Sequence, residues 1–246
     1  MSNDVRLVSH STPSTEFAHQ GISNVQELIA FCARVSNPNN QLNNKTSEKL
    51  IMYLIQNSHW SPLEMASVCI EINTTRDIAR QILRHRSFSF QEFSQRYADP
   101  IKELTFVFRE ARLQDNLNRQ NSIETEDEEL KANWLLQQEN IKTVSTNAYK
   151  WAIDNGIAKE VARAILPEGL IQSRVYMSGS IRSWIHYIET RTHKSTQKEH
   201  REIAFKCLEE IVKILPGALT FMGSPKNNDN KKISTTFEKI SEWLGL

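Results

Sequence analysis

The sequence predicts an α+β fold, built as a single helix-rich domain with a mixed sheet and flanking helices. Helical periodicity covers most of the 246 residues, and the few short β-prone stretches lie between helices at irregular intervals. No internal repeat is visible, and no linker rich in Pro, Gly or Ser divides the chain into halves. These observations favour one α+β domain over a doubly wound sheet, in which strands and helices alternate regularly.

The helices are predicted from apolar residues at helical spacing, with an N-cap at Ser23 or Asn24 and a stop at Pro167. The segments with this pattern are 24–35, 47–56, 74–83, 128–154, 157–165, 181–190 and 198–215. Enrichment in β-forming residues predicts four short strands, at 5–8, 65–72, 105–108 and 172–177. The polar stretch 113–127 is expected to be an exposed loop or insertion.

The domain is expected to cover residues 1–223. Residues 224–246 begin with an Asn- and Lys-rich stretch and are expected to form a mobile C-terminal extension with a short helix at 237–244. The first residues lack the basic region and apolar run of an export signal, and no stretch has the length of a membrane span. A cytoplasmic location without a membrane partner is therefore expected.

Charge, cysteine and histidine content argue against several classes of protein. The 30 basic residues nearly balance the 29 acidic ones, whereas a nucleic-acid binder usually carries a basic excess. Neither a disulfide framework nor a zinc site is expected from three widely spaced cysteines, Cys32, Cys69 and Cys207. His186, His193 and His200 recur every seven residues rather than every four, so no metal site is expected, and the last two are interpreted as surface or interface residues.

Glycine placement restricts how a nucleotide can bind. The chain has only seven glycines, and none forms the G-x-G-x-x-G turn of dinucleotide-binding folds or a P-loop. Any bound nucleotide must therefore have its phosphates held by side chains or helix ends.

The segment 84–96 is the strongest candidate for such a site. It contains three arginines, one histidine, one glutamate, two glutamines and three serines, interleaved with phenylalanines. Arginine side chains bind phosphate through paired charge-assisted hydrogen bonds, and a glutamate can accept from a ribose hydroxyl or a base N–H. A solvated, cationic helix end is the ordinary explanation of an Arg-x-Arg pair. The dense mixture with aromatic residues favours a nucleotide pocket, to which Gln81 adds an amide one turn earlier.

The motif itself resembles the signature of the flavin-dependent thymidylate synthases. The pattern R-H-R-x-x-S-x-x-x-x-S-x-R is filled without a departure by Arg84, His85, Arg86, Ser89, Ser94 and Arg96. Further segments resemble other elements of the family, namely 59–64, 162–167, 180–191 and 197–199. The resemblance extends over roughly residues 25–215.

This resemblance implies an FAD-dependent methyltransferase that converts deoxyuridine monophosphate (dUMP) to thymidine monophosphate (dTMP). Methylenetetrahydrofolate would supply the carbon, NADPH the electrons, and FAD would carry the hydride. The family's α+β fold assembles as a homotetramer, with each active site between subunits. No nucleic-acid partner is implied.

The resemblance also assigns site residues. The expected FAD contacts are His59, Ser61, Arg84, His85, Arg86, Glu92, Ser180, Ile181, Arg182 and His186. The expected dUMP contacts are Gln81, Arg84, Glu92, Ser94, Gln95, Arg96, Arg163 and Arg191. Ser180 and His186 stand where the family often has asparagine, but both can still form hydrogen bonds to adenine or ribose.

No protein nucleophile is expected. Cys207 lies among apolar residues of a predicted helix and is interpreted as a packing residue. Ser94 is interpreted as a ligand contact, because neighbouring arginines stay protonated and cannot act as its base. A hydride from reduced flavin can activate the pyrimidine instead. The resemblance makes Arg191 the catalytic residue, a fixed cation that favours the ionised uracil ring.

Two alternatives stay open on the sequence alone. The basic and aromatic segment 84–97 is also compatible with a nucleic-acid-binding protein, although the near-zero net charge argues against it. A catalytically inactive paralogue that keeps the fold is the other.

Overall fold

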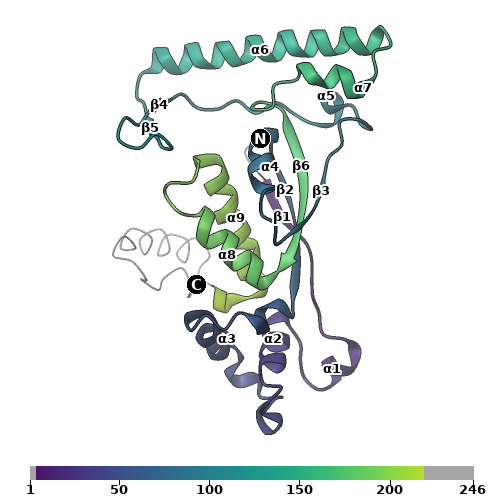
Figure 1. The fold of residues 1–246 in the computed structure, drawn as a ribbon, viewed down its shortest axis with the longest axis vertical. Helices are drawn as coiled ribbons and strands as arrows, with labels where there is room; N and C mark the ends of the chain where they lie inside the picture. Colours follow the sequence, from purple (N-terminus) through teal and green to yellow (C-terminus); the bar gives the residue numbers. More distant parts are fainter. Residues whose placement is uncertain (1–3, 219–246) are drawn as a thin grey trace. The chain divides into compact units, whose positions relative to one another are not determined.

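A computed structural model describes residues 4–218 of the chain and confirms the α+β class (Figure 1). The strands are β1 (Asp4–His10), β2 (Ser67–Thr75), β3 (Ser89–Glu92), β4 (Arg112–Gln114), β5 (Ser122–Glu124) and β6 (Gln172–Ser180). The α-helices are α1 (Thr15–His19), α2 (Val25–Ala33), α3 (Ser47–Gln56), α4 (Arg76–Ile82), α5 (Pro100–Glu103), α6 (Glu128–Asp154), α7 (Lys159–Ala162), α8 (Ile181–Arg191) and α9 (Lys198–Ile214). Short 3-10 helices include η3 (Ser61–Glu64) and η4 (Arg163–Ile165). The predicted C-terminal extension, 224–246, lies outside the described residues.

Four strands form one sheet in the order β1-β2-β6-β3, and β4 and β5 form a separate antiparallel hairpin. Backbone bonds from Ser11 to Ser67 and from Arg76 to Ile171 join the end of one strand to the beginning of its neighbour. The pairs β1–β2 and β2–β6 are therefore antiparallel, where a mixed sheet was expected. Antiparallel neighbours need no crossover helix, which agrees with the irregular order of helices and strands along the chain.

The chain divides into two compact units, and we describe each by itself. The first unit comprises Met1–Arg6, Ile70–Met177 and Arg191–Lys206. The second unit comprises Leu7–Cys69, Ser178–Thr190 and Cys207–Leu246. The single domain 1–223 expected from the sequence stays a prediction.

The core of the second unit is formed by the apolar faces of α2, α3 and α8. Asn24 caps α2 as predicted, because its side chain accepts from the Glu27 N–H at 2.9 Å. Trp184 is fully buried, and its indole N–H donates to the Val68 carbonyl at 3.0 Å. Cys207 is also fully buried, which confirms that it is a packing residue, and burial raises the pKa of its thiol. Burial also raises the thiol pKa of Cys32.

In the first unit, the end of α6 packs with α7 and the start of β6. Tyr149, Ala152, Ala162, Leu166 and Ile171 form a buried cluster, against which Phe106 packs. The predicted strand 105–108 is reduced to a single bridge between Phe106 and Ile171. The segment that pairs with it turns at Pro167, just before β6 begins, so the pairing cannot extend into a longer ladder. The thiol of Cys69, in β2, has a pKa raised by burial.

Other elements differ from the prediction in instructive ways. The predicted helix 157–165 is shorter and divides into α7 and η4. The predicted loop 113–127 contains most of the hairpin formed by β4 and β5. Strand β3 lies inside the cationic motif, in a segment where the sequence predicts no strand. In the part of the chain that the structure describes, no helix is both long and apolar enough to cross a membrane.

Glu71, in β2, is a buried carboxylate of the first unit that several hydrogen bonds hold in place. Its side chain is 2% exposed, accepts from Arg6 Nε at 2.9 Å and Nη2 at 3.1 Å, and accepts from Asn73 at 3.2 Å. Burial alone would raise its pKa. Hydrogen bonds from Arg6, Tyr176 and Asn73 outweigh burial and lower the pKa of Glu71 to about 2.

Replacement of Glu71 by Gln is expected to lower the free energy of unfolding at pH 7 by roughly 1–3 kcal/mol, because hydrogen bonds to a charged group are lost. The folded pKa is lower than the unfolded value of about 4.3, so the carboxylate stabilises the fold above that pH and loses its effect as the pH falls towards 2. The wild-type and variant proteins should therefore converge in urea unfolding experiments as the pH falls. Glu139→Gln, at an exposed mid-helix position, is the control. An equal loss in both variants, or a difference independent of pH, would contradict the assignment.

Gly156 follows the end of α6 with a φ of +77°, and a Cβ there would meet no atom within 4 Å. Gly156→Ala is therefore expected to cost about 1 kcal/mol of stability through backbone strain alone. Gly169→Ala is the matched control, because that position has the same open space without a left-handed φ. Thermal unfolding of both variants separates the two effects. Equal melting temperatures would show that α6 does not need a glycine here.

Candidate active site

The site residues predicted from the sequence fall into two sets, one in each unit. The set in the first unit is Gln81, Arg84, His85, Arg86, Glu92, Ser94, Gln95, Arg96, Arg163 and Arg191. The set in the second unit is His59, Ser61, Ser180, Ile181, Arg182 and His186. The geometry of each set is described in turn.

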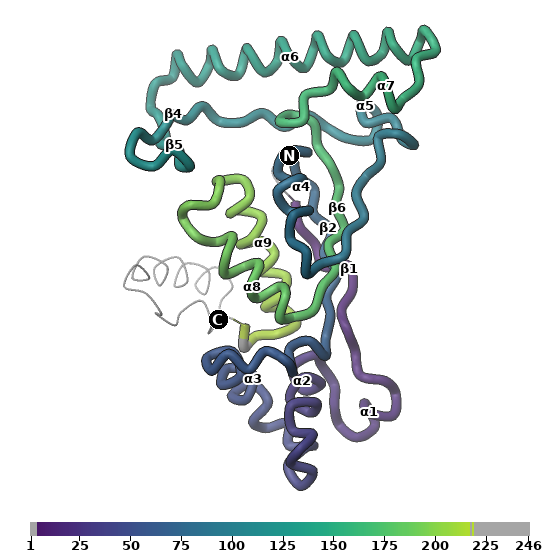
Figure 2. The backbone as a smooth tube through the Cα atoms, viewed as in Figure 1, coloured from purple at the N-terminus to yellow at the C-terminus, as the bar shows by residue number. Residues whose placement is uncertain are grey.

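The cationic motif of the first unit begins where α4 ends. Figure 2 traces the chain from α4 through a tight turn at residues 83–88 into β3, which borders β6 in the sheet. Arg84 and Arg86 are exposed on this turn and form no ion pair with any residue in the described range 4–218. Two neighbouring guanidinium groups without a carboxylate partner suit a ligand with phosphate groups.

Arg191, the predicted catalytic residue, contacts this motif although it lies 106 positions away from His85. Its Nε donates to His85 Nε2 at 2.9 Å. An arginine can only donate, so His85 accepts through Nε2 and carries its proton on Nδ1. Burial and, secondarily, the charge of Arg191 lower the pKa of His85 to about 4. The ring is therefore neutral near pH 7.

Gln81 is held at both ends of its amide. Its Nε2 donates to Gln197 Oε1 at 2.8 Å, and its Oε1 lies 3.3 Å from His200 Nδ1. His200 is fully buried, which contradicts the prediction of a surface or interface histidine. Burial, followed by the charge of Arg191, lowers the pKa of His200 to about 3. Its ring centroid lies 6.3 Å from that of His85, so Gln81 and Arg191 belong to one polar cluster.

Glu92 and Gln95 face the sheet from the end of the motif. Glu92 accepts from Ser173 Oγ at 2.7 Å and lies 3.8 Å from Arg76. Gln95 is 3% exposed, and its Nε2 has no hydrogen-bond partner among the described residues. A buried amide donor without a partner costs free energy, so this atom fits a site that a polar ligand completes.

Glu160 brings two further predicted residues together. Its carboxylate lies 3.5 Å from Arg96, and its backbone carbonyl accepts from Arg163 Nε at 3.4 Å. The two arginines thus lie near each other, at the end of the motif and in η4. Ser94 is half-buried, and its hydroxyl oxygen is 3.4 Å from the Arg96 N–H. Both arginines keep enough exposure to bind an anion.

The set in the second unit is built around η3 and the start of α8. Arg182 donates to Glu64 at 2.5 Å, and the rings of Trp60 and His186 are 4.5 Å apart. Ser180 accepts from the Ser183 N–H at 3.3 Å and so caps α8. These contacts join the 59–64 turn to the first turns of α8.

His59, Ser61 and Ile181 differ in what they can offer a ligand. His59 and Ser61 are exposed, and His59 follows Ser58, whose φ is +60°. Ile181 is fully buried, and its N–H donates to the Ala66 carbonyl at 2.9 Å. It belongs to the core that supports the turn.

Each set, taken by itself, offers groups that suit part of a flavin dinucleotide. The first has Arg84 and Arg86 for phosphate groups, and the second has half-exposed Arg182 and half-exposed His186, whose ring lies 4.5 Å from that of Trp60. In the described part of the chain, no group of three or more His, Cys, Asp or Glu side chains lies close enough to hold a metal ion. A cavity of about 500 Å³ in the first unit is lined by other residues, at 108–111, 124–126, 131, 135 and 198.

Several residues that surround the first set were not predicted from the sequence. Gln197, His200, Ser173 and Glu160 all contact predicted site residues. His200 had a signal in the sequence, because it shares helical spacing with buried Ala204 and Cys207 on α9. Gln197 lies in the segment 197–199 that resembles the family, although no contact was predicted for it. Ser173 and Glu160 are polar residues whose partners are far away in sequence, so no local pattern marks them.

Comparisons with known proteins agree with this geometry. Residues 19–217 match the family model described as "Thymidylate synthase complementing protein". The probable flavin-dependent thymidylate synthase of Paramecium bursaria Chlorella virus 1 is 48% identical over 86% of this chain and 94% of its own length. The flavin-dependent thymidylate synthase of Synechocystis sp. is 46% identical over 87% of this chain and 96% of its own.

A solved structure has the same fold. The UMP/dUMP methylase PolB from Streptomyces cacaoi, bound with 5-Br dUMP, matches with a TM-score of 0.73 at 23% identity, over 90% of this chain and 94% of PolB. At this identity the match speaks for the fold alone. The family model and the relatives from the Chlorella virus and Synechocystis cover most of the chain. The chain also contains the cationic motif and the other segments that resemble the family. The chain therefore belongs to the flavin-dependent thymidylate synthase family.

Proposed function

We propose that this chain methylates dUMP to dTMP with FAD as its bound cofactor, methylenetetrahydrofolate as carbon donor and NADPH as reductant. Family membership supports the reaction. The observation that carries the proposal is the hydrogen bond from Arg191 to His85, which joins the cationic motif to the expected catalytic arginine.

The first set of residues suits a pyrimidine nucleotide. Arg84, Arg96 and Arg163 provide cations for the phosphate of dUMP. Gln81 and Gln95 provide amides for the base, whose edge alternates carbonyl oxygens with an N–H. Glu92 and Ser94 complete the polar surface around the ribose and phosphate. In this proposal Arg191 stabilises the negative charge that develops on the uracil ring.

FAD, when bound, supplies the hydride that the pyrimidine receives. The residues proposed to hold FAD are Arg84, His85, Arg86 and Glu92 of the first set and His59, Ser61, Ser180, Arg182 and His186 of the second. Ile181 supports them from the core. Cys207 does not supply a thiolate, because it is fully buried and its raised pKa keeps the thiol protonated. With hydride from FAD, none is needed.

We further propose that the chain works as a homotetramer with active sites between subunits. Helix α6 supports this, because it exposes several large apolar side chains that water solvates poorly. These are Trp134, Leu135, Leu136, Ile141, Val144 and Trp151. Sedimentation or light scattering of the purified chain would measure the assembly. The cytoplasmic location and the preference for NADPH stay predictions.

Two measurements test the function directly. The purified protein should be yellow, with flavin absorbance at about 450 nm, and should take up added FAD if prepared without it. It should also release tritium from dUMP labelled at C5 when methylenetetrahydrofolate and NADPH are present. Colourless protein that does not take up FAD would contradict the proposal. Bound FAD without methylation would indicate the inactive paralogue.

Arg191→Ala is expected to keep FAD bound while tritium release falls by at least about 100-fold, because a preorganised cation for the developing charge is lost. The control is Arg119→Ala, which removes an exposed arginine from the loop between β4 and β5. Flavin absorbance and tritium release are measured on the same preparations. Unchanged turnover in Arg191→Ala would remove this residue from its catalytic role.

A further inference from the structure

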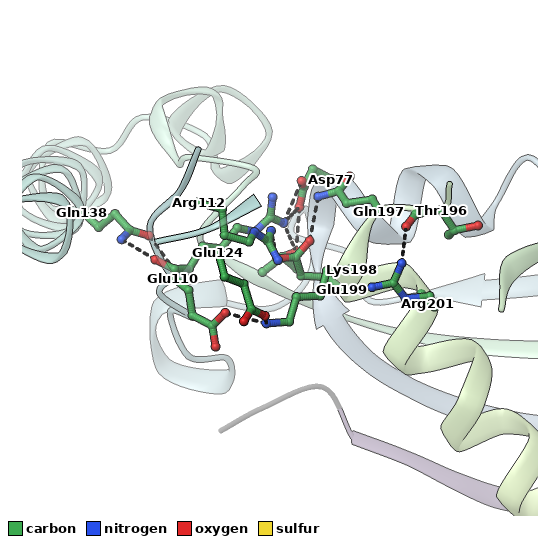
Figure 3. Close-up of polar contacts among 12 residues, drawn as sticks. Asp77, Glu110, Arg112, Glu124, Gln138, Thr196, Gln197, Lys198, Glu199 and Arg201 are labelled. Carbon is green, nitrogen blue, oxygen red and sulfur yellow. Dashed lines mark hydrogen bonds and ion pairs between the residues drawn. The ribbon is translucent and has the colours of Figure 1, made fainter. Parts of the chain in front are cut away.

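A chain of hydrogen bonds reaches Gln81 from the hairpin formed by β4 and β5. Arg112, at the start of β4, forms an ion pair with Glu199 in the first turn of α9. Glu199 Oε2 accepts from Gln197 Nε2 at 2.9 Å, and Gln197 Oε1 accepts from Gln81 Nε2 at 2.8 Å. Figure 3 shows Arg112, Gln197 and Glu199 gathered at the beginning of α9. We call Arg112, Glu199, Gln197 and Gln81 the amide relay.

The relay begins at a carboxylate that is ionised and largely buried. The side chains of Arg112 and Glu199 are 12% and 17% exposed. Burial would raise the pKa of Glu199. Hydrogen bonds from its own backbone N–H and from Gln197, with the charges of Arg112 and Arg109, lower the pKa instead. An ionised carboxylate only accepts hydrogen bonds.

This acceptor fixes the direction of every bond that follows. Gln197 must turn its NH2 group to Glu199, and its carbonyl oxygen therefore faces Gln81. Gln81 must in turn present its NH2 group to Gln197, which leaves its carbonyl oxygen towards His200. His200 then donates from Nδ1, a donation that its neutral ring permits. Reversal of any amide would place two donors or two acceptors face to face.

The fixed amide of Gln81 has one N–H and one carbonyl lone pair left after these two bonds. Uracil, neutral or ionised, has a carbonyl oxygen at C4 that can accept from this N–H. Cytosine has an amine at C4, which would face the same N–H as a second donor. The orientation of this amide therefore distinguishes the two bases.

We propose that Glu199 is a positioning residue that, through Gln197, fixes the amide of Gln81 in the orientation that selects uracil over cytosine. The inference rests on the proposed function, since Gln81 is taken to contact the pyrimidine. It also gives the hairpin a role, because Arg112 anchors the carboxylate from which the relay begins.

Lys198 provides a matched contrast. It is the neighbour of Glu199, and its Nζ contacts Glu110 at 2.7 Å and Glu124 at 3.1 Å (Figure 3). Lys198 therefore links the same hairpin to the same helical turn without touching the relay. If Glu199 only anchored the hairpin, a change of Lys198 should cause the same defect as a change of Glu199.

The test compares Glu199→Gln with Lys198→Met in the full chain loaded with FAD. The amide that replaces the Glu199 carboxylate can both donate and accept, so the relay loses its direction. Glu199→Gln is expected to raise KM for dUMP about tenfold, as for one or two lost hydrogen bonds, with kcat and flavin content changed by less than about threefold. The ratio of dissociation constants for dCMP and dUMP should fall by a similar factor. Lys198→Met should leave both quantities within about twofold of wild type.

A second variant keeps the inference testable if Glu199→Gln does not fold. Gln197→Met cuts the relay and leaves the ion pair between Arg112 and Glu199 intact. It should give the same KM defect, and the double variant should add nothing, since both changes break one chain of bonds. Suppose that the wild-type chain is active. Additive defects in the double variant, or variants that keep the wild-type ratio of dissociation constants for dCMP and dUMP, would then overturn this inference but not the proposed function. A wild-type chain that binds neither FAD nor dUMP would overturn the proposed function as well.

Discussion

The hydrogen bond from Arg191 to His85 pairs a cation with a neutral group. The polar cluster around it depends on the neutral state of this partner. A carboxylate partner would neutralise the guanidinium, whereas a histidine held neutral by burial leaves the positive charge available. Within the described residues Arg191 has no ion pair. The bond thus orients the arginine and preserves its field for a ligand.

Burial, and after it the charge of the same cation, keeps a second histidine of the cluster neutral. His200 is fully buried, and its pKa is lowered by burial, by Arg191 and by His85. A neutral His200 can donate to Gln81 through one ring nitrogen without adding a second charge beside Arg191. One guanidinium is therefore the main charge of this cluster. The neutral groups around it fix the direction of the hydrogen bonds and add no charge.

Long periodic helices were predictable, because their burial repeats every three to four residues. The predicted helices at 47–56 and 128–154 coincide with α3 and α6. Strand β3 was not predictable, because Phe90 is the only apolar residue among the four of Ser89–Glu92, too few to define an apolar face. The segment 105–108 has strand composition but meets only one paired residue, and pairing is decided by the partner, not by the segment.

The site was predictable where a motif marks it and not where it depends on tertiary contacts. Arg84, His85 and Arg86 stand in a dense pattern that the sequence displays openly. Gln197 and Glu199 lie in a segment that resembles the family, but the sequence assigns them no role, and their contacts with Gln81 and Arg112 appear only in the structure. The sequence therefore predicts which groups contact a ligand, while the contacts that orient these groups appear only in the structure.

The state of the three thiols has a consequence for how the enzyme can be damaged or inhibited. Cys207 is fully buried, and burial raises the thiol pKa of Cys32 and Cys69 as well. Electrophiles and peroxides attack the thiolate, so all three side chains are poor targets at neutral pH. A reagent that acts by alkylating a reactive thiolate therefore has no preferred target among the three cysteines of this chain.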